Sequence, residues 1–357
     1  MTLVRWWFCC VFGLLPLLAQ AQVYLDVGIV VFDEGLQAPV SSDGENVFPR
    51  IRRAEALYMP VQLRRMLEAT GDWGAVRVLP DDSPLVDLTV HGRIVSATGQ
   101  RLSLFLEARD ASGRVWLARE YTQAASADTY PVSDGDEPFA GLYREVVDDL
   151  GRMLASLSVS DLEQLRLVAS LRYAQGLAPE AFAGYLQGGG DAPWELLREP
   201  AADDPMLARV ERVRQQEYLF VDVADEQYGE LHDAMATTYN LWRQYRWEQA
   251  TYRVQYEERV ELREDNDRPG SYPSMLRDYN AYRAYRIQQQ DLDELAGGFN
   301  NEIEPTVVQT RGRVFRLGGT LQARYDEWRR LMREIFRLET GLPPEAADAG
   351  RSAPGVE

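Results

Sequence analysis

Lysine is absent from this sequence of 357 residues, so arginine supplies all 38 of its Lys and Arg positions. Lysine provides the amine of Schiff-base enzymes, a phosphate contact in P-loops and the base of Ser-Lys hydrolases. None of these three arrangements is open to the chain. Codon bias in a GC-rich genome also produces uniform use of arginine, so the absence excludes chemistry without indicating a function.

Cysteine and histidine are nearly absent as well. The two cysteines, Cys9 and Cys10, lie within the first 21 residues, and the two histidines are His91 and His232. The chain after residue 21 contains no cysteine, so it has no disulfide framework, no thiol catalysis and no Cys-ligated zinc site. His91 and His232 fall in regions that we assign to different domains, which argues against a two-histidine metal site or a Ser-His-Asp triad. We therefore expect no metal, no cofactor and no catalytic residues.

Negative charge is in excess, because 56 Asp and Glu residues give the chain a net charge of −18. The excess is present in both halves of the sequence, and neither half forms a basic patch. Nucleic acid and anionic membrane surfaces are repelled by such a chain over long range. We expect an envelope protein or a peptidoglycan-associated protein as partner, and no nucleic acid.

Residues 1–21 have the pattern of a secretory signal peptide. Arg5 provides the positive start, residues 6–18 form an apolar run, and Ala19-Gln20-Ala21 is a small-x-small site of the kind that signal peptidase cleaves. The run is too short to span a bilayer, and no cysteine stands after it at a lipobox position. Cleavage would leave Gln22 first and free the protein in the periplasm, without integral membrane insertion. An uncleaved N-terminal anchor is the alternative.

Residues 22–157 alternate between strand and helix patterns and predict a mixed α/β domain of order β-α-β-β-β-β-α. A β-rich run covers residues 25–33, a helical pattern covers 51–70, and a short strand covers 75–79. Three alternating segments, starting at Val86, Leu102 and Val115, follow as an antiparallel meander. Pro138 then opens a helix that contains Leu142 and Leu150.

The pattern after Leu157 is almost purely helical, which makes the fold class α+β. Residues 158–200 predict a helical hairpin connector, with a capping box at Ser160 to Glu163 and a second helix from Pro179 to Gly188. Residues 204–342 predict a long antiparallel helical hairpin, a small β-hairpin around Arg311-Gly312 and a terminal helix that ends at Gly341. Residues 343–357 are expected to be a disordered tail.

The longest predicted element starts at Asp204-Pro205, an N-cap followed by a first-turn proline, and runs to about Arg263. Its apolar residues recur at steps of three and four, apart from polar Arg214 and Glu217. A return helix over residues 274–296 would complete a coiled-coil-like seam. A helix of this length exceeds ordinary globular helices, so we expect the hairpin to protrude as an arm.

The first domain resembles a group of bacterial envelope proteins. Leu63, Met66-Leu67, Thr70-Gly71 and Val76-Arg77-Val78 mark a helix that ends in glycine and runs into a strand, and residues 87–94 form the following strand. With the order of elements, they resemble the α/β domain shared by the N-terminal part of TolB, the curli-secretion lipoprotein CsgG and the penicillin-binding-protein activator LpoB. That resemblance implies an envelope scaffold or regulator. The chain departs from the group in lacking a lipidated cysteine and propeller repeats.

Aromatic side chains in the predicted hairpin outnumber what one seam can bury, and arginines alternate with them. Guanidinium groups and Tyr hydroxyls outside the seam could bind a glycan, a peptide or another protein. Alternatively, these side chains pack within the hairpin and against the last helix. The candidate binding face consists of Tyr239, Arg243, Arg246, Trp247, Arg253, Tyr282, Arg283, Tyr285 and Arg286.

An acidic group, formed by Glu217, Asp222, Asp225 and Glu226, lies on the long helix. Two carboxylates at a suitable distance could act as acid and base on a sugar, whereas a solvated acidic face is the simpler interpretation. Two functions stay open. The first is an exported, non-enzymatic periplasmic envelope protein that acts as a scaffold, adaptor or regulator. The alternative is a carboxylate-dependent glycan hydrolase.

Overall fold

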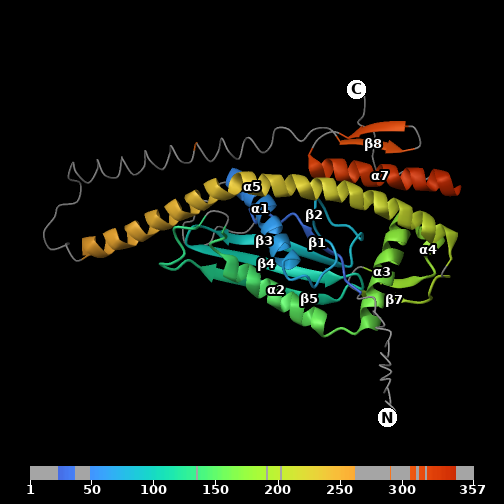
Figure 1. Ribbon diagram of the computed structural model, residues 1–357, viewed down its shortest axis with the longest axis horizontal. Helices are drawn as coiled ribbons and strands as arrows, with labels where there is room; N and C mark the ends of the chain where they lie inside the picture. Colours follow the sequence, from blue (N-terminus) through green and yellow to red (C-terminus); the bar gives the residue numbers. More distant parts are fainter. Residues whose placement is uncertain are drawn as a thin grey trace, which may run out of the picture.

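The computed structural model describes residues 23–36, 49–133, 136–189, 192–201, 203–261, 290, 306–310, 313–317 and 320–342. A mixed sheet with two helices comes first and a mainly helical region follows (Figure 1), which confirms the α+β class. The predicted signal peptide (1–21) and tail (343–357) lie outside the described residues. So does the predicted return helix (274–296), apart from residue 290.

The first part contains a five-stranded sheet of order β2-β1-β3-β4-β5. Its strands are β1 (Val27–Val30), β2 (Val76–Leu79), β3 (Leu88–Ala97), β4 (Arg101–Asp110) and β5 (Val115–Ala124). β1 pairs in parallel with β2 and β3, and β3, β4 and β5 form an antiparallel meander. The helices α1 (Pro49–Glu68) and α2 (Ala140–Ala155) complete the predicted order β-α-β-β-β-β-α.

Helices α1 and α2 cover one face of the sheet (Figure 1). Because strand side chains alternate between faces, every second residue points to these helices, and Ile29, Val90 and Leu104 are completely buried there. The apolar stripe of α2, which includes Leu142 and Leu150, packs on the same core. Over β3, β4 and β5 the opposite face carries mostly polar side chains that are partly or fully exposed.

The connection from β2 to β3 crosses the sheet without a helix. Gly28 in β1 lies beneath it, and a Cβ on Gly28 would lie 2.4 Å from Leu79 and 2.9 Å from Val86. Only glycine leaves room for this close approach. The connection is bound by the long helix α5 (Pro205–Glu261), whose Arg214 and Tyr218 side chains both donate to the Leu85 carbonyl oxygen.

Residues 158–200 differ from the prediction. Ser158 caps α3 (Val159–Leu177) in a capping box with Asp161, so the helix begins before the box predicted at Ser160. The expected second helix is a single turn, α4 (Pro179–Phe182), and β6 (Leu186–Gly189) and β7 (Ala192–Leu196) follow as a β-hairpin. Gly188 and Gly189 have φ of 124° and 110°, which a tight turn can use and a helix cannot.

Helix α5 (Pro205–Glu261) is continuous over 57 residues, about 85 Å at the usual rise per residue. It crosses the whole molecule and its last turns extend past the sheet (Figure 1). The terminal helix α7 (Leu321–Thr340) lies beside the first half of α5 and ends at Gly341, which has φ of 73°. The predicted β-hairpin is also present, as β8 (Thr306–Thr310) and β9 (Arg313–Leu317).

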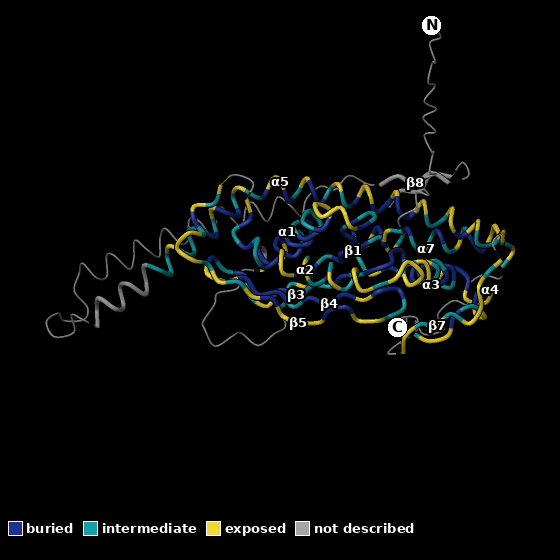
Figure 2. The backbone as a smooth tube through the Cα atoms, turned by 60° about the horizontal axis from the view of Figure 1, so that its bottom comes forward, coloured by how far each residue is buried: buried dark blue, intermediate teal, exposed yellow. Residues whose placement is uncertain are grey.

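One side of α5 is buried along most of its length and the other is exposed (Figure 2). Val210, Val221 and Met235 face inward, whereas Leu219 and Leu241 are exposed. The repeat of three and four therefore packs on α1, β2, α3 and α7. Most of α5 is thus part of the folded body, and of its described residues only the last turns extend past the sheet (Figure 1). The return helix expected to complete the arm lies outside the described residues.

Candidate functional site

Buried polar groups are concentrated where α5 contacts the rest of the chain. Three side chains of α5 are central to these contacts: Glu217, Asp225 and Arg243. Along the helix axis they are separated by about 12 Å and about 27 Å, from the rise per residue. Each is bound by residues that are distant in the sequence.

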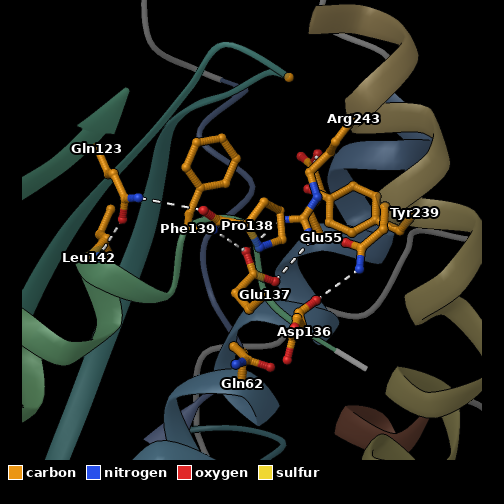
Figure 3. Close-up of polar contacts among 12 residues, drawn as sticks. Glu55, Gln62, Gln123, Asp136, Glu137, Pro138, Phe139, Leu142, Tyr239 and Arg243 are labelled. Atoms are coloured by element: carbon orange, nitrogen blue, oxygen red, sulfur yellow. Dashed lines mark hydrogen bonds and ion pairs between the residues drawn. The ribbon is translucent and has the colours of Figure 1, made fainter. Parts of the chain in front are cut away.

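The Arg243 contact is a buried ion pair (Figure 3). Arg243 is 2% exposed, and its Nη1 and Nη2 donate to the two Glu137 carboxylate oxygens at 2.7 and 2.9 Å. Asn240 on the same helix donates to the Asp136 carbonyl oxygen at 2.9 Å. Burial is the largest single influence and disfavours the Arg243 charge, but Glu137, Tyr239 and Tyr58 together outweigh it and the pKa of Arg243 is raised. The ionised pair fixes α5 to the segment before α2.

Tyr239 lies one turn before Arg243 and faces α1. Its hydroxyl donates to Glu55 Oε1 at 2.8 Å, and its ring meets the Tyr58 ring edge-on at 5.1 Å. Burial raises the pKa of Tyr239 well above its usual value, so the hydroxyl keeps its proton. The Arg243 guanidinium lies over the same ring, 4.1 Å from its centroid. The hydrogen bond to Glu55 and the edge-on contact with Tyr58 join α5 to α1, whereas the cation–π contact lies within α5.

These positions correct part of the predicted binding face. Tyr239 and Arg243 are buried inside the chain, because the side of α5 assigned to a partner is the side that packs on α1. Trp247 packs against Tyr130, with ring centroids 5.7 Å apart, and Arg246 lies over the Trp242 ring. The side chains of the remaining members, Arg253, Tyr282, Arg283, Tyr285 and Arg286, fall outside the described residues.

The Asp225 contact covers the edge of the sheet. Its carboxylate accepts the backbone N–H of Val78 in β2 at 2.8 Å and also binds the Arg64 guanidinium of α1. One turn earlier, Arg77 of β2 donates to Asp222. Burial raises the pKa of Asp225, and the Val78 N–H and Arg64 oppose that rise. A strand edge that could have paired with another chain is thereby closed by α5.

The Glu217 contact joins four segments of the chain. This buried carboxylate accepts hydroxyl hydrogen bonds from Ser83 at 3.0 Å, Tyr173 at 2.7 Å and Tyr325 at 2.5 Å. Arg329 Nε lies 3.7 Å from the same carboxylate. Burial raises the pKa of Tyr173 and Tyr325, so both remain donors. Glu217 thus connects the β2–β3 connection, α3 and α7 to α5.

The predicted solvated acidic face was therefore wrong for Glu217 and Asp225, which bind the fold. Asp222 is exposed but paired with Arg77, and Glu226 is exposed. A glycan hydrolase requires two carboxylates that a sugar can reach. Glu217 is buried and Asp225 is partly buried, and both are engaged by hydroxyl, amide or guanidinium donors. Only Asp222 and Glu226 of this group remain accessible to a sugar, and Asp222 is paired with Arg77.

His232 is buried between α1 and α5. Its ring stacks on Tyr58 with centroids 4.1 Å apart, and its two nitrogens lie 3.2 Å from Gln62 Oε1 and 3.3 Å from Asp233 Oδ1. Burial, followed by the nearby Arg65 charge, lowers the pKa of His232. His91 lies on the open face of the sheet, 3.7 Å from Asp82. His232 is thus a packed and satisfied histidine.

In the described part of the chain, no three His, Cys, Asp or Glu side chains are grouped so that they could hold a metal ion. No helix among the same residues is long and apolar enough to cross a membrane.

One sequence signal pointed to the Glu217 contact. Arg214 and Glu217 interrupt the apolar repeat of the long helix, and both lie at positions that the repeat turns inward. No comparable signal marked Glu137, which lies in a loop. Comparison with protein-family models, curated proteins and solved structures found no significant match for the chain.

Proposed function

We propose that this chain is an exported, non-enzymatic scaffold or adaptor of the bacterial envelope, which presents the distal end of α5 to a protein partner in the periplasm. The observation that carries the proposal is the attachment of α5 at Glu217, Asp225 and Arg243. Three polar contacts along one helix, of which those of Glu217 and Arg243 are buried, set its direction. The residues beyond Arg243 continue that direction past the sheet (Figure 1).

The residue types available support this proposal over the hydrolase. Lysine is absent, both cysteines precede the expected cleavage site, and both histidines lie on the α/β body or its contact with α5. The acidic residues of the long helix that are buried serve as hydrogen-bond acceptors for the fold. What the described residues provide is a folded body from which the last turns of α5 extend.

Export is tested by intact-mass analysis of protein isolated from the periplasmic fraction. We expect a mature chain that begins at Gln22. A retained N-terminus would place the protein on an uncleaved anchor instead and would contradict the periplasmic part of the proposal.

The scaffold role is tested by a photo-crosslinking amino acid at Glu248, an exposed position on α5 beyond Arg243. The matched control carries it at Glu226, which is exposed in the middle of the same helix. We expect a protein partner to be crosslinked from Glu248, with a lower yield when Arg243→Met loosens the helix. Equal yields from both positions, unchanged by Arg243→Met, would contradict a positioned end.

The alternative is tested with purified protein and isolated peptidoglycan. We expect no release of soluble fragments. Release that is abolished by a single carboxylate substitution would support the hydrolase and refute the scaffold proposal.

A further inference from the structure

The two edge strands of the sheet, β2 and β5, have different surroundings. At the β2 edge, Asp225 accepts the Val78 N–H and α5 lies along the strand. At the other edge, β5 pairs with β4 over ten residues. Among the described residues, no backbone hydrogen bond reaches Ala118, Glu120, Thr122 or Ala124 of β5 from outside the β4–β5 pair.

The pairing register shows which backbone groups of β5 point outward. Ala125 N donates to the Gln100 carbonyl oxygen, and Arg101 lies opposite Ala124. In an antiparallel pair, hydrogen-bonded and non-bonded positions alternate. Leu117, Arg119, Tyr121 and Gln123 therefore bond to β4. The N–H and C=O groups of Ala118, Glu120, Thr122 and Ala124 point to the free edge, and their side chains are exposed.

In the part of the chain that the structure describes, this edge lacks most of the devices that keep edge strands from pairing. Such strands are usually short, contain proline, or are covered by other elements. β5 is ten residues long and contains no proline. Arg119 is occupied by Glu145 and Asp149 of α2, on the inner face of the sheet. Arg119 and Glu120 are the two charged residues of β5, and of these Glu120 lies on the open face, beside the outward groups.

From this we infer that the edge of β5 binds an extended segment of a partner protein as a sixth strand, with a basic residue of that segment beside Glu120. Main-chain hydrogen bonds would supply affinity and alternate side chains would supply specificity. Charge favours this occupant over a second copy of the chain, because each copy carries a net charge of −18 and two copies repel. The inference rests on the proposed role as a binding protein and names a binding site for that role.

The test uses the full-length exported protein with a photo-crosslinker placed singly at Ala118, Glu120 or Thr122. Crosslinked peptides are identified by mass spectrometry. A partner strand would be crosslinked at every second residue of one segment, in an order that runs steadily along β5, because strand side chains alternate. Crosslinks to a second copy of the chain would overturn the inference, as would crosslinks scattered over unrelated segments, or none.

Two variants separate backbone pairing from a nearby surface contact, read out as crosslinking yield from Thr122. Glu120→Pro removes an outward N–H while keeping every bond to β4, and we expect the yield to fall by about tenfold, the effect of one lost hydrogen bond and a steric block. Glu120→Arg keeps the N–H and reverses the charge, and should also lower the yield. If Glu120→Pro does not fold, the inference is tested by the crosslinking yield of Glu120→Arg and by the order of the crosslinks along β5. An unchanged yield in Glu120→Arg would contradict the inference that a basic residue of the partner lies beside Glu120.

Failure of this inference and failure of the scaffold role give different results. Crosslinking from Glu248 without ordered crosslinks from β5 would support the scaffold role and contradict the binding of a partner strand at the β5 edge. Absence of partners from all positions would reject both.

Discussion

Gly99 and Arg243 meet through their backbones: a Cβ on Gly99 would lie only 2.0 Å from the Arg243 carbonyl oxygen. Gly99 lies in the turn between β3 and β4, and the same Cβ would be 2.6 Å from the backbone nitrogen of Trp247. Tyr130, which packs on Trp247, donates its hydroxyl proton to the Gly99 carbonyl oxygen at 3.0 Å. The turn and the helix thus touch without an intervening side chain.

Gly99→Ala should therefore push α5 away from the sheet. We expect the free energy of unfolding to fall by about 1–3 kcal/mol, as for overpacked cores, measured by urea denaturation. The matched control is Gly151→Ala in α2, where a Cβ meets nothing within 4 Å. In that helix the same substitution should stabilise by about 0.5–1 kcal/mol. Equal effects at the two sites would show that the contact of Gly99 with α5 is unimportant.

Removing the partner of Arg243 should cost more. Glu137→Gln leaves a buried guanidinium without its counterion, and we expect a loss of about 3–5 kcal/mol. As a control, Arg152→Gln breaks an ion pair with Asp149 in which the arginine side chain is 75% exposed, and should change stability by less than about 0.5 kcal/mol. A small effect of Glu137→Gln would mean that water reaches Arg243 and that the ion pair does not fix α5.

Tyr325→Phe should weaken the attachment of α7. The substitution removes one of three hydroxyl donors to Glu217, at a cost of about 1–2 kcal/mol. Glu217→Ala leaves three buried hydroxyls without their acceptor and should cost more. The readout is hydrogen exchange of the backbone amides. In both variants we expect exchange to accelerate relative to the wild type, and to accelerate more in α7 than in α2. Uniform acceleration throughout the chain would contradict a local attachment.

His232 should make the α1–α5 contact sensitive to acid. Its pKa in the folded chain lies below the ordinary value of 6.5, because burial and Arg65 disfavour the charged ring. The unfolded chain therefore takes up the proton first. The stability contributed by neutral His232 is complete above about pH 6.5 and is lost as the pH falls through that value toward the folded pKa.

The measurement compares the unfolding free energy of the wild type and of His232→Gln between pH 7.5 and 5.5. We expect the wild type to lose more stability over this range. The difference between the two proteins isolates the histidine from Asp87 and Asp225, whose pKa values are raised by burial and which titrate in both. Parallel curves would show that protonation of His232 is not coupled to folding.

Much of the fold could be read from periodicity. The alternating segments from Val27 to Ala124 gave the strands, and the proline after Asp204 and the glycine at 341 gave the ends of α5 and α7. The connector at 186–196 could not be read in this way. The spacing of the few apolar residues in this segment fits a helix and a strand equally well. Only the pairing of Leu186 with Leu196 decides between them.

The sequence by itself determined which chemistries are open to this protein and where its long helix runs, because residue types and local periodicity are properties of the chain. Tertiary structure alone decided which partner each side chain met. The apolar repeat of α5 demands a packed side but does not say against what, so Tyr239 and Arg243 could be assigned to a partner until α1 and Glu137 were found against them. The reason is physical. A carboxylate on a helix looks the same in sequence whether solvent or three hydroxyls surround it, and at Glu217 the fold supplied the hydroxyls.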